Sequence, residues 1–353
     1  MKNRAAALLG LAFLLTAGCF VTATIIVRGP VKYVPANMGA LFLPGGETVR
    51  LVIKDQRAED SVIAGGFSHV GGYGDKYGFA LSERPDTVPN FFDSALKEGI
   101  EILGLRAGDG PVLELTIKDF RIGFFVTSAM YTPPNYVAYG LIETALKSPD
   151  GTPLKSQKLR VAVFLSGTGE DPTGYIYCRA AWEAASRALL AEYPLRPDPE
   201  AIAKLLKALD VRGDDYRRAR AVFWLGLAGK DNPAVAEKLF SLFRSEKDQT
   251  VRESAAVALA MLASPGAREE FEAVLAGGKK LAAWDVTDLE ETWHLLHCLA
   301  VLGATDLKAK VPANHKGRSK LLELVRFHEA GEIPAHSPEE AKALVEARKK
   351  LKK

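Results

Sequence analysis

The sequence predicts two folded parts: an α+β domain with an antiparallel sheet and two helices, then an all-α domain of helical repeats. Before residue 194, apolar and polar residues alternate in several short runs, which is the pattern of half-buried strands. After residue 199 these runs stop, and ten-residue stretches that begin at Ala219 and Ser254 align at an offset of 35. A third stretch, which begins at His294, aligns with the second at an offset of 40. Such recurrence predicts stacked repeats.

The composition is that of a folded soluble protein. The 353 residues are 48% hydrophobic and 25% charged, which excludes a mainly disordered chain, a collagen-like repeat and a multi-span membrane protein. The net charge of +3 approaches neutrality once Lys2 and Arg4 are removed, so we expect no nucleic-acid partner. Three cysteines exclude a disulfide-rich scaffold and a multi-cysteine zinc module.

The N-terminus has the features of a secretory signal. Lys2 and Arg4 precede an apolar run over residues 5–15, followed by the letters TAGC, which end at Cys19. Eleven residues of helix span about 16 Å, against about 30 Å of hydrocarbon, so this run predicts a signal-peptide core and not a membrane span. The small residues before Cys19 resemble the bacterial lipobox.

That resemblance implies that residues 1–18 are a lipoprotein signal peptide and that Cys19 becomes the acylated first residue. Thr16 departs from the pattern, because leucine is commoner there, and a plain secretory signal with a coincidental cysteine is the alternative. Several acyl chains anchor a protein stably. Phe20, in place of aspartate, resembles the outer-membrane sorting case. We therefore expect residues 19–46 to be a lipidated tether in the bacterial envelope, facing the periplasm.

The α+β domain is expected over residues 47–193. Asn90 is the predicted N-cap of a helix that ends at Gly104, and residues 148–151 (SPDG) have turn chemistry. The expected order is strand, helix, three strands and a closing helix, at residues 49–53, 90–104, 113–117, 135–147, 159–165 and 175–192. Strands joined by turns predict an antiparallel sheet with both helices on one side.

This part resembles the YajG-like and related transport-auxiliary lipoproteins. The resemblance is carried by the lipobox, the strand LVIKDQR at residues 51–57, the helix near Phe92, the strand VLELTIKDF at residues 112–120 and the last helix. It implies a small α+β lipoprotein domain without catalytic residues. The glycine-rich stretch Gly65–Gly78 departs from this pattern. Within it, the glycines at 72, 74 and 78 lack the Lys-Ser/Thr ending of a phosphate loop and predict a flexible loop.

The second domain is expected over residues 198–353. Pro194, Pro197 and Pro199 mark the boundary, and we expect independent folding on either side of it. Each aligned stretch is preceded by another predicted helix, at residues 201–209, 234–243 and 267–275. Paired helices with a period near 40 resemble HEAT or armadillo stacks, and residues 251–259 resemble the second helix of a HEAT repeat. Helices from Ser319 onward should cap the stack.

One cluster offers metal-ligating side chains. Glu291, His294 and His297 lie on one helical face, but no second ligand helix has matching spacing. The repeat alignment places His297 and Cys298 at packed positions, so we expect no metal and no cofactor. The alternative is a metal-dependent or hydrolytic envelope enzyme that uses His294 and His297. Cys178 and Cys298 are expected to be buried free thiols, although an exported protein would permit a disulfide.

Two groups of residues are candidates for binding a partner. Phe125, Tyr131 and Tyr136 surround a proline-containing hairpin tip, and they form either sheet core or an exposed apolar tip. Arg217, Arg218 and Arg252 recur near the start of the second helix of a repeat, where they either bond carbonyls and acids between repeats or line a groove for an acidic segment. The basic residues 348–353 form a solvated helix end or contact anionic lipids.

These features together predict a non-enzymatic, lipid-anchored envelope protein that acts as an interaction scaffold or a transport-auxiliary lipoprotein. Helical solenoids present extended surfaces to partners, and the sequence does not assemble an acid, a base and a nucleophile. The membrane is contacted through the lipid on Cys19, and the envelope protein partner is not identified by the sequence.

Overall fold

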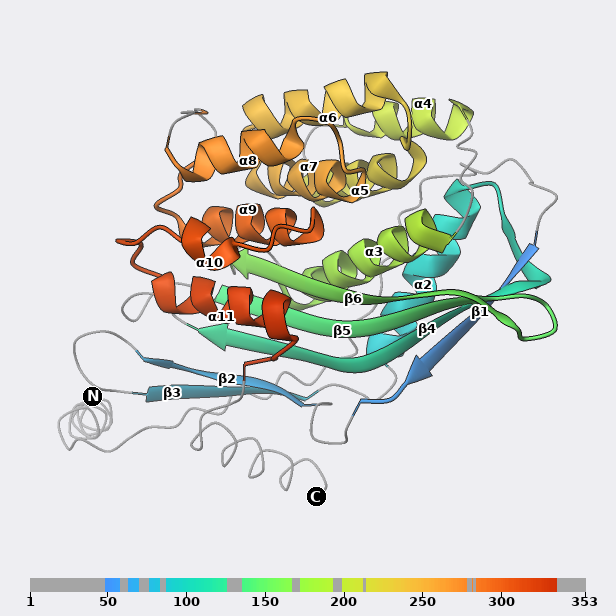
Figure 1. Cartoon of the computed structure of the whole chain (residues 1–353), viewed down its shortest axis with the longest axis horizontal. Helices are drawn as coiled ribbons and strands as arrows, with labels where there is room; N and C mark the ends of the chain where they lie inside the picture. Colours follow the sequence, from blue (N-terminus) through green and yellow to red (C-terminus); the bar gives the residue numbers. More distant parts are fainter. Residues whose placement is uncertain are drawn as a thin grey trace, which may run out of the picture.

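The computed structural model describes residues 48–57, 63–69, 76–82, 87–125, 135–166, 172–192, 199–211, 214–277, 281 and 284–334. It confirms the predicted fold class, because a four-stranded sheet with helices is followed by a helical repeat region (Figure 1). The expected signal peptide, Cys19, the tether, Tyr131 and residues 348–353 lie outside the described residues.

The main sheet has the strand order β1-β4-β5-β6. Its strands are β1 (Thr48–Asp55), β4 (Arg106–Phe125), β5 (Asn135–Lys147) and β6 (Pro153–Ser166). β4, β5 and β6 are antiparallel, as predicted. β1 departs from the predicted arrangement, because it pairs with β4 in parallel. Parallel strands need a crossover connection, and helix α2 (Thr87–Ile102) lies in the crossover between them.

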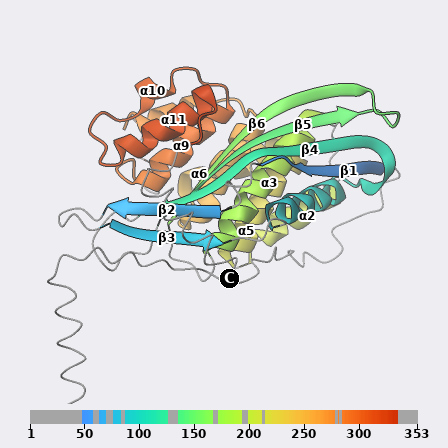
Figure 2. The same ribbon diagram turned by 90° about the horizontal axis from the view of Figure 1, so that it is seen from below.

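A second, two-stranded sheet was not predicted. β2 (Ile63–His69) and β3 (Lys76–Ser82) form an antiparallel hairpin in which Gly65 pairs with Ala80 and Gly78 pairs with Phe67. The loop interpretation is therefore wrong for Gly78, while residues 70–75 lie outside the described residues. Glycine adds no side chain to the pattern of a strand, so these strands lack a sequence signature. β2 lies against β4 (Figure 2).

Helices α2 and α3 (Pro172–Glu192) cover one face of the main sheet (Figure 2). Phe120 of β4 packs against Phe92 of α2 and Tyr177 of α3, with ring centroids 5.8 Å apart in both pairs. α2 begins at Thr87 and not after Asn90, because the first turn of a helix needs no internal N–H partner and accommodates Pro89. It ends at Ile102, and the predicted stop, Gly104, lies just beyond, where its φ of 72° lets the N–H of Leu105 bond the carbonyl of Ile100.

The repeat region consists of helix pairs. These are α4 (Pro199–Ala208) with α5 (Asp215–Ala228), α6 (Pro233–Ser245) with α7 (Gln249–Met261), and α8 (Ala267–Leu275) with α9 (Leu289–Val301). The short α10 (Leu307–Lys310) and α11 (Arg318–Ala330) follow, and α11 is the cap expected near Ser319. Asp214, Asn232, Asp248 and Asp288 accept backbone N–H bonds at the starts of α5, α6, α7 and α9.

The helix pairs form two layers (Figure 1). α4, α6 and α8 form an outer layer, of which only one side is buried. α5, α7 and α9 form an inner layer in which consecutive residues are buried all round, for example residues 219–228, 251–260 and 290–299. The inner layer is buried on its second side because α3 contacts α5 and α7, and because α9 contacts β6.

The repeats therefore wrap around the β6 edge of the sheet. Tyr139 of β5 points away from the face that Phe120 occupies, since its neighbour Gly140 pairs with Phe120. On this opposite face Tyr139 packs against Trp293 of α9 and Phe327 of α11, at centroid distances of 5.6 Å and 4.9 Å. One hydrophobic core runs from Val49 to Phe327 without a break at the expected boundary. Residues 193–198 themselves lie outside the described residues.

Candidate functional site

Charged side chains are buried where α3 meets the inner helices. We call this set the interface network, and its members are Arg179, Glu183, Arg187, Glu253, His294, His297 and His328. They come from α3, α7, α9 and α11, so the network joins the sheet layer to three helices of the repeat region. Buried charges need partners, and the network supplies them within the chain.

The first half of the network is centred on Arg179. One nitrogen of its guanidinium donates to Glu253 at 3.0 Å, and the other lies 3.0 Å from Nε2 of His294. Because a guanidinium can only donate, Nε2 of His294 must accept. The proton of the neutral ring then lies on Nδ1, which is 2.9 Å from the carbonyl oxygen of Glu290 and 3.1 Å from Glu253. His294 is therefore held as a neutral imidazole.

The direction of the His294 pKa shift agrees with that assignment. Burial alone would raise the pKa of the Glu253 carboxyl, but His294 and Arg179 lower it from 4.5 to about 2. Burial lowers the pKa of His294 below its ordinary value. At neutral pH, Arg179 and Glu253 form a buried ion pair beside an uncharged histidine.

The second half of the network is centred on His297. Its Nε2 donates to the carboxylate of Glu183 at 3.0 Å, and its Nδ1 lies 3.0 Å from Nε2 of His328. Arg187 donates to Glu183 at 2.8 Å. Burial would raise the pKa of Glu183, but His297 and Arg187 lower it. Burial, together with the nearby His297, Arg187 and Arg160, lowers the pKa of His328 well below 6.5.

The contacts of Arg179 decide whether this part of the interface network suits a metal ion. Ligand atoms of Glu253, Glu290 and His294 lie within 4.8 Å of one another, which is compact enough for a metal ion. The guanidinium of Arg179, however, is within hydrogen-bond distance of Glu253 and His294 and supplies the positive charge there. These residues therefore do not fit a metal ion while Arg179 is in place.

Glu291, His294 and His297 are not brought together by the structure. His294 bonds Arg179, His297 bonds Glu183 and His328, and Glu291 accepts from Arg252 at 2.6 Å. Both histidine rings are almost fully buried, at 1% and 0% exposure. The three residues share a helical face as predicted, but each side chain bonds different partner residues: His294 and His297 meet Arg179 and Glu183 of α3, and Glu291 meets Arg252 of α7.

Two of the three arginines proposed for partner binding, Arg218 and Arg252, bond residues of the neighbouring repeat. Arg252 is 4% exposed, donates to Glu291 and to the carbonyl oxygens of residues 246 and 247, and lies over the ring of Trp284. Arg218 donates to Glu246 at 2.5 Å and to the carbonyl oxygen of Leu209. Arg217 is half-buried at the start of α5. Arg218 and Arg252 therefore bond carbonyls and acids between repeats, which is the first of the two roles that the sequence allowed for them.

The aromatic hairpin tip is only partly described. Tyr136 is half-buried in β5, where it packs against the core, which is the first of the two roles considered for it. The backbone of Phe125 ends β4 opposite Asn135, and its side chain lies outside the described residues.

Cys178 and Cys298 are buried and free, as expected, and burial raises the pKa of the Cys298 thiol well above its usual value.

Sequence reasoning missed most of the interface network. Arg179 and Glu183 of α3 have the four-residue spacing of an ordinary surface ion pair. The available signal was their position beside Trp182, on a helix that is apolar on nearly all sides.

Within the residues that the structure describes, no helix has the length and apolar character to cross a membrane.

Comparison with known proteins places the repeats in a class. Residues 179–280 match a family model described as HEAT repeats, and this match begins inside α3. The C-terminal part of the chain therefore contains HEAT-like repeats. Among solved structures, the chain is similar to protein XCC0632 from Xanthomonas campestris, of family DUF330, with 16% identity and a TM-score of 0.27. That similarity covers 46% of this chain and 90% of the other. The curated proteins include no match.

Proposed function

We propose that this chain is a non-enzymatic, lipid-anchored scaffold of the bacterial envelope, held to the membrane by acyl chains on Cys19. The observation that carries the scaffold role is the array of HEAT-like repeats, since such arrays offer extended surfaces to protein partners. A transport-auxiliary role facing the periplasm is the narrower version, and its support is the resemblance of residues 19–193 to YajG-like lipoproteins. The outer membrane is the proposed location because Phe20 follows Cys19.

The partner surface that we propose is the outer layer, formed by α4, α6 and α8. The inner helices are buried by α3 and by the sheet, so a partner cannot reach them without unfolding the chain. The outer layer exposes charges of both signs, for example Lys207, Glu237 and Arg268. Exposed charges of both signs favour a partner that binds reversibly through polar contacts.

Support for a non-enzymatic role comes from the histidines. The four ring nitrogens of His294 and His297 lie within hydrogen-bond distance of groups from the same chain. A catalytic or metal-binding use of either ring would break a buried contact.

Fractionation of cells tests the anchor. The Cys19→Ser variant should leave the detergent-extracted membrane fraction or remain unprocessed, because serine cannot accept the acyl group. Cys178→Ser removes a buried thiol instead and is the matched control, so it should fractionate like the native chain. A Cys19→Ser protein that is processed and stays in the membrane would refute the lipid anchor.

Site-specific photocrosslinking in intact cells tests the scaffold surface. A crosslinker at exposed Ser241 of α6 or Arg268 of α8 should give one adduct of the same mass. The control position is Asp150, in the exposed turn between β5 and β6. An adduct at Asp150 without one on α6 or α8 would place the partner surface on the sheet and overturn this assignment.

A further inference from the structure

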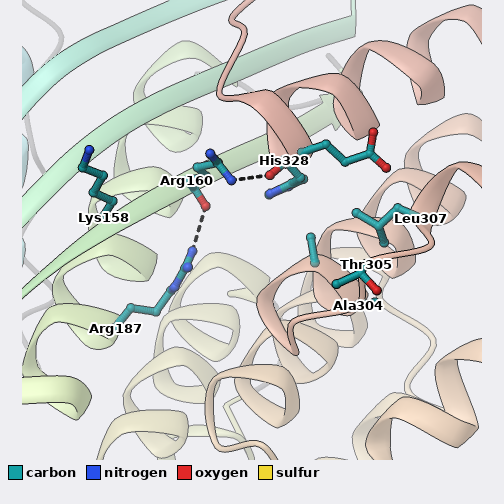
Figure 3. A pocket seen from close by; sticks show the side chains of 9 residues that line it. Lys158, Arg160, Arg187, Ala304, Thr305, Leu307 and His328 are labelled. Carbon is teal, nitrogen blue, oxygen red and sulfur yellow. Dashed lines mark hydrogen bonds between the residues drawn. The ribbon is translucent and has the colours of Figure 1, made fainter.

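A cavity of about 410 Å³ lies at the β6 edge, where the repeats close onto the sheet (Figure 3). Lys158 and Arg160 of β6 and Arg187 of α3 line one side. Ala300, Ala304 and Leu307, from the region of α9 and α10, line the other. The cavity thus combines three basic side chains with an apolar wall, and it is large enough to hold a small organic molecule.

Arg160 differs from the other inner arginines, because no carboxylate in the described part of the chain balances its charge. Arg179, Arg187, Arg218, Arg220 and Arg252 each bond a carboxylate, namely that of Glu253, Glu183, Glu246, Glu98 and Glu291 respectively. Arg160 instead donates to the backbone carbonyl oxygen of His328 (Figure 3). Among the residues that the structure describes, no carboxylate lies within 4.0 Å of its guanidinium.

Two other basic residues, Arg187 and Lys158, line the cavity beside Arg160. Arg187 holds the β6 edge by donating to the carbonyl oxygen of Arg160 at 2.8 Å. Lys158 is 85% exposed, and its amine lies 3.8 Å from Glu143, so it remains free to turn toward a ligand. Glu329 also lines the cavity and is the one acidic side chain among its lining residues. Because Glu183 balances Arg187, the positive charge that a ligand can meet comes from Arg160 and from the exposed amine of Lys158.

We propose that this cavity binds a small organic anion, whose phosphate or carboxylate oxygens bond Arg160 and Lys158 while its apolar part lies against Ala304 and Leu307. The planar guanidinium of Arg160 offers parallel donors that suit either acidic group. The bound anion would take the place that a glutamate takes beside each of the other inner arginines. It would also lie between β6 and the α9–α11 helices, and so it would strengthen the closure of the repeats onto the sheet.

Isothermal titration calorimetry with hexyl phosphate tests the proposal. The full chain should bind it saturably, with binding weakened by added salt, whereas hexanol should not bind, because it lacks the anionic group. Thr305 lines the cavity and is exposed, so substitution there should leave the fold intact. Thr305→Glu places a negative charge at the mouth and should weaken binding at least tenfold. Thr305→Gln has the same size without the charge and should bind like the native chain.

Two further arms identify the groups and the source of the anion. Lys158→Gln should weaken binding several-fold, with an unchanged melting temperature, because its side chain is exposed. Vesicles of phosphatidylcholine with phosphatidic acid, compared with hexyl phosphate, distinguish a lipid headgroup from a soluble anion. Loss of both interactions in Thr305→Glu supports the site for either source. Equal binding by Thr305→Glu and Thr305→Gln, or no saturable binding of either probe by the native chain, overturns it.

Discussion

Replacing Arg179 with methionine tests whether the interface network stabilises the fold. The substitution keeps much of the side-chain volume but leaves the Glu253 carboxylate buried without its cation. His294 and Arg179 both lower the pKa of this carboxyl, so loss of the guanidinium removes part of what keeps the buried carboxylate charged. Breaking a buried ion pair by removing one partner costs about 3–5 kcal/mol. We therefore expect Arg179→Met to lower the free energy of unfolding by about 3 kcal/mol, out of the 5–15 kcal/mol that is typical of a folded protein.

Urea titration followed by circular dichroism at pH 7 measures this change. The double variant Arg179→Met, Glu253→Gln should be more stable than Arg179→Met alone, because it no longer buries an unpaired charge. Acidification to about pH 5 should narrow the gap between Arg179→Met and the native chain, since His294 can then take up a proton beside Glu253. A loss below about 1 kcal/mol for Arg179→Met, or a double variant no more stable than the single one, would refute the reasoning.

Three further outcomes are expected. Burial lowers the pKa of His328, so between that pKa and 6.5 the unfolded chain binds more protons than the folded chain. The melting temperature should therefore fall as the pH drops below 6.5. The fall should be less steep in the His328→Gln variant. Gly226→Ala should lower the melting temperature, because the added Cβ lies 2.9 Å from Cβ of Ala258, and Ala258→Gly in the same chain should restore part of the loss. A fragment over residues 198–353 should be aggregated or unfolded, because α3 and β6, which it lacks, bury its inner helices. Sedimentation and circular dichroism measure this. A monomeric, helical fragment would contradict the expectation and would support the independent folding that the prolines predicted.

The sequence was sufficient for the elements whose signal is local. Strand Asn135–Lys147 and helix Ala267–Leu275 have the bounds that their patterns predicted. In both, one face is apolar at a regular period, and a turn or a cap lies at the end. The hairpin at residues 63–82 was missed because its glycines interrupt the alternation.

The buried contacts between distant parts could not be predicted in the same way. Arg179 and Glu253 are 74 positions apart, and His297 and Glu183 are 114 apart. Helical periodicity indicates which residues share a face but not which neighbouring helix that face meets. For the same reason the cluster at Glu291, His294 and His297 suggested a common ligand, while the packing gives each residue a different partner.

The wrapping of the repeats around the β6 edge also changes how the chain should fold. An open helical array contacts only its neighbours along the chain, so it can begin to fold at any repeat and lengthen stepwise. Here the last helix of the array returns to the sheet through contacts such as that between Arg160 of β6 and His328 of α11, which are 168 positions apart. Closing so long a loop slows the search for the native state, and it couples the end of the array to the sheet. The molecule should therefore unfold in one cooperative step, where an open stack of the same helices would fray from its ends.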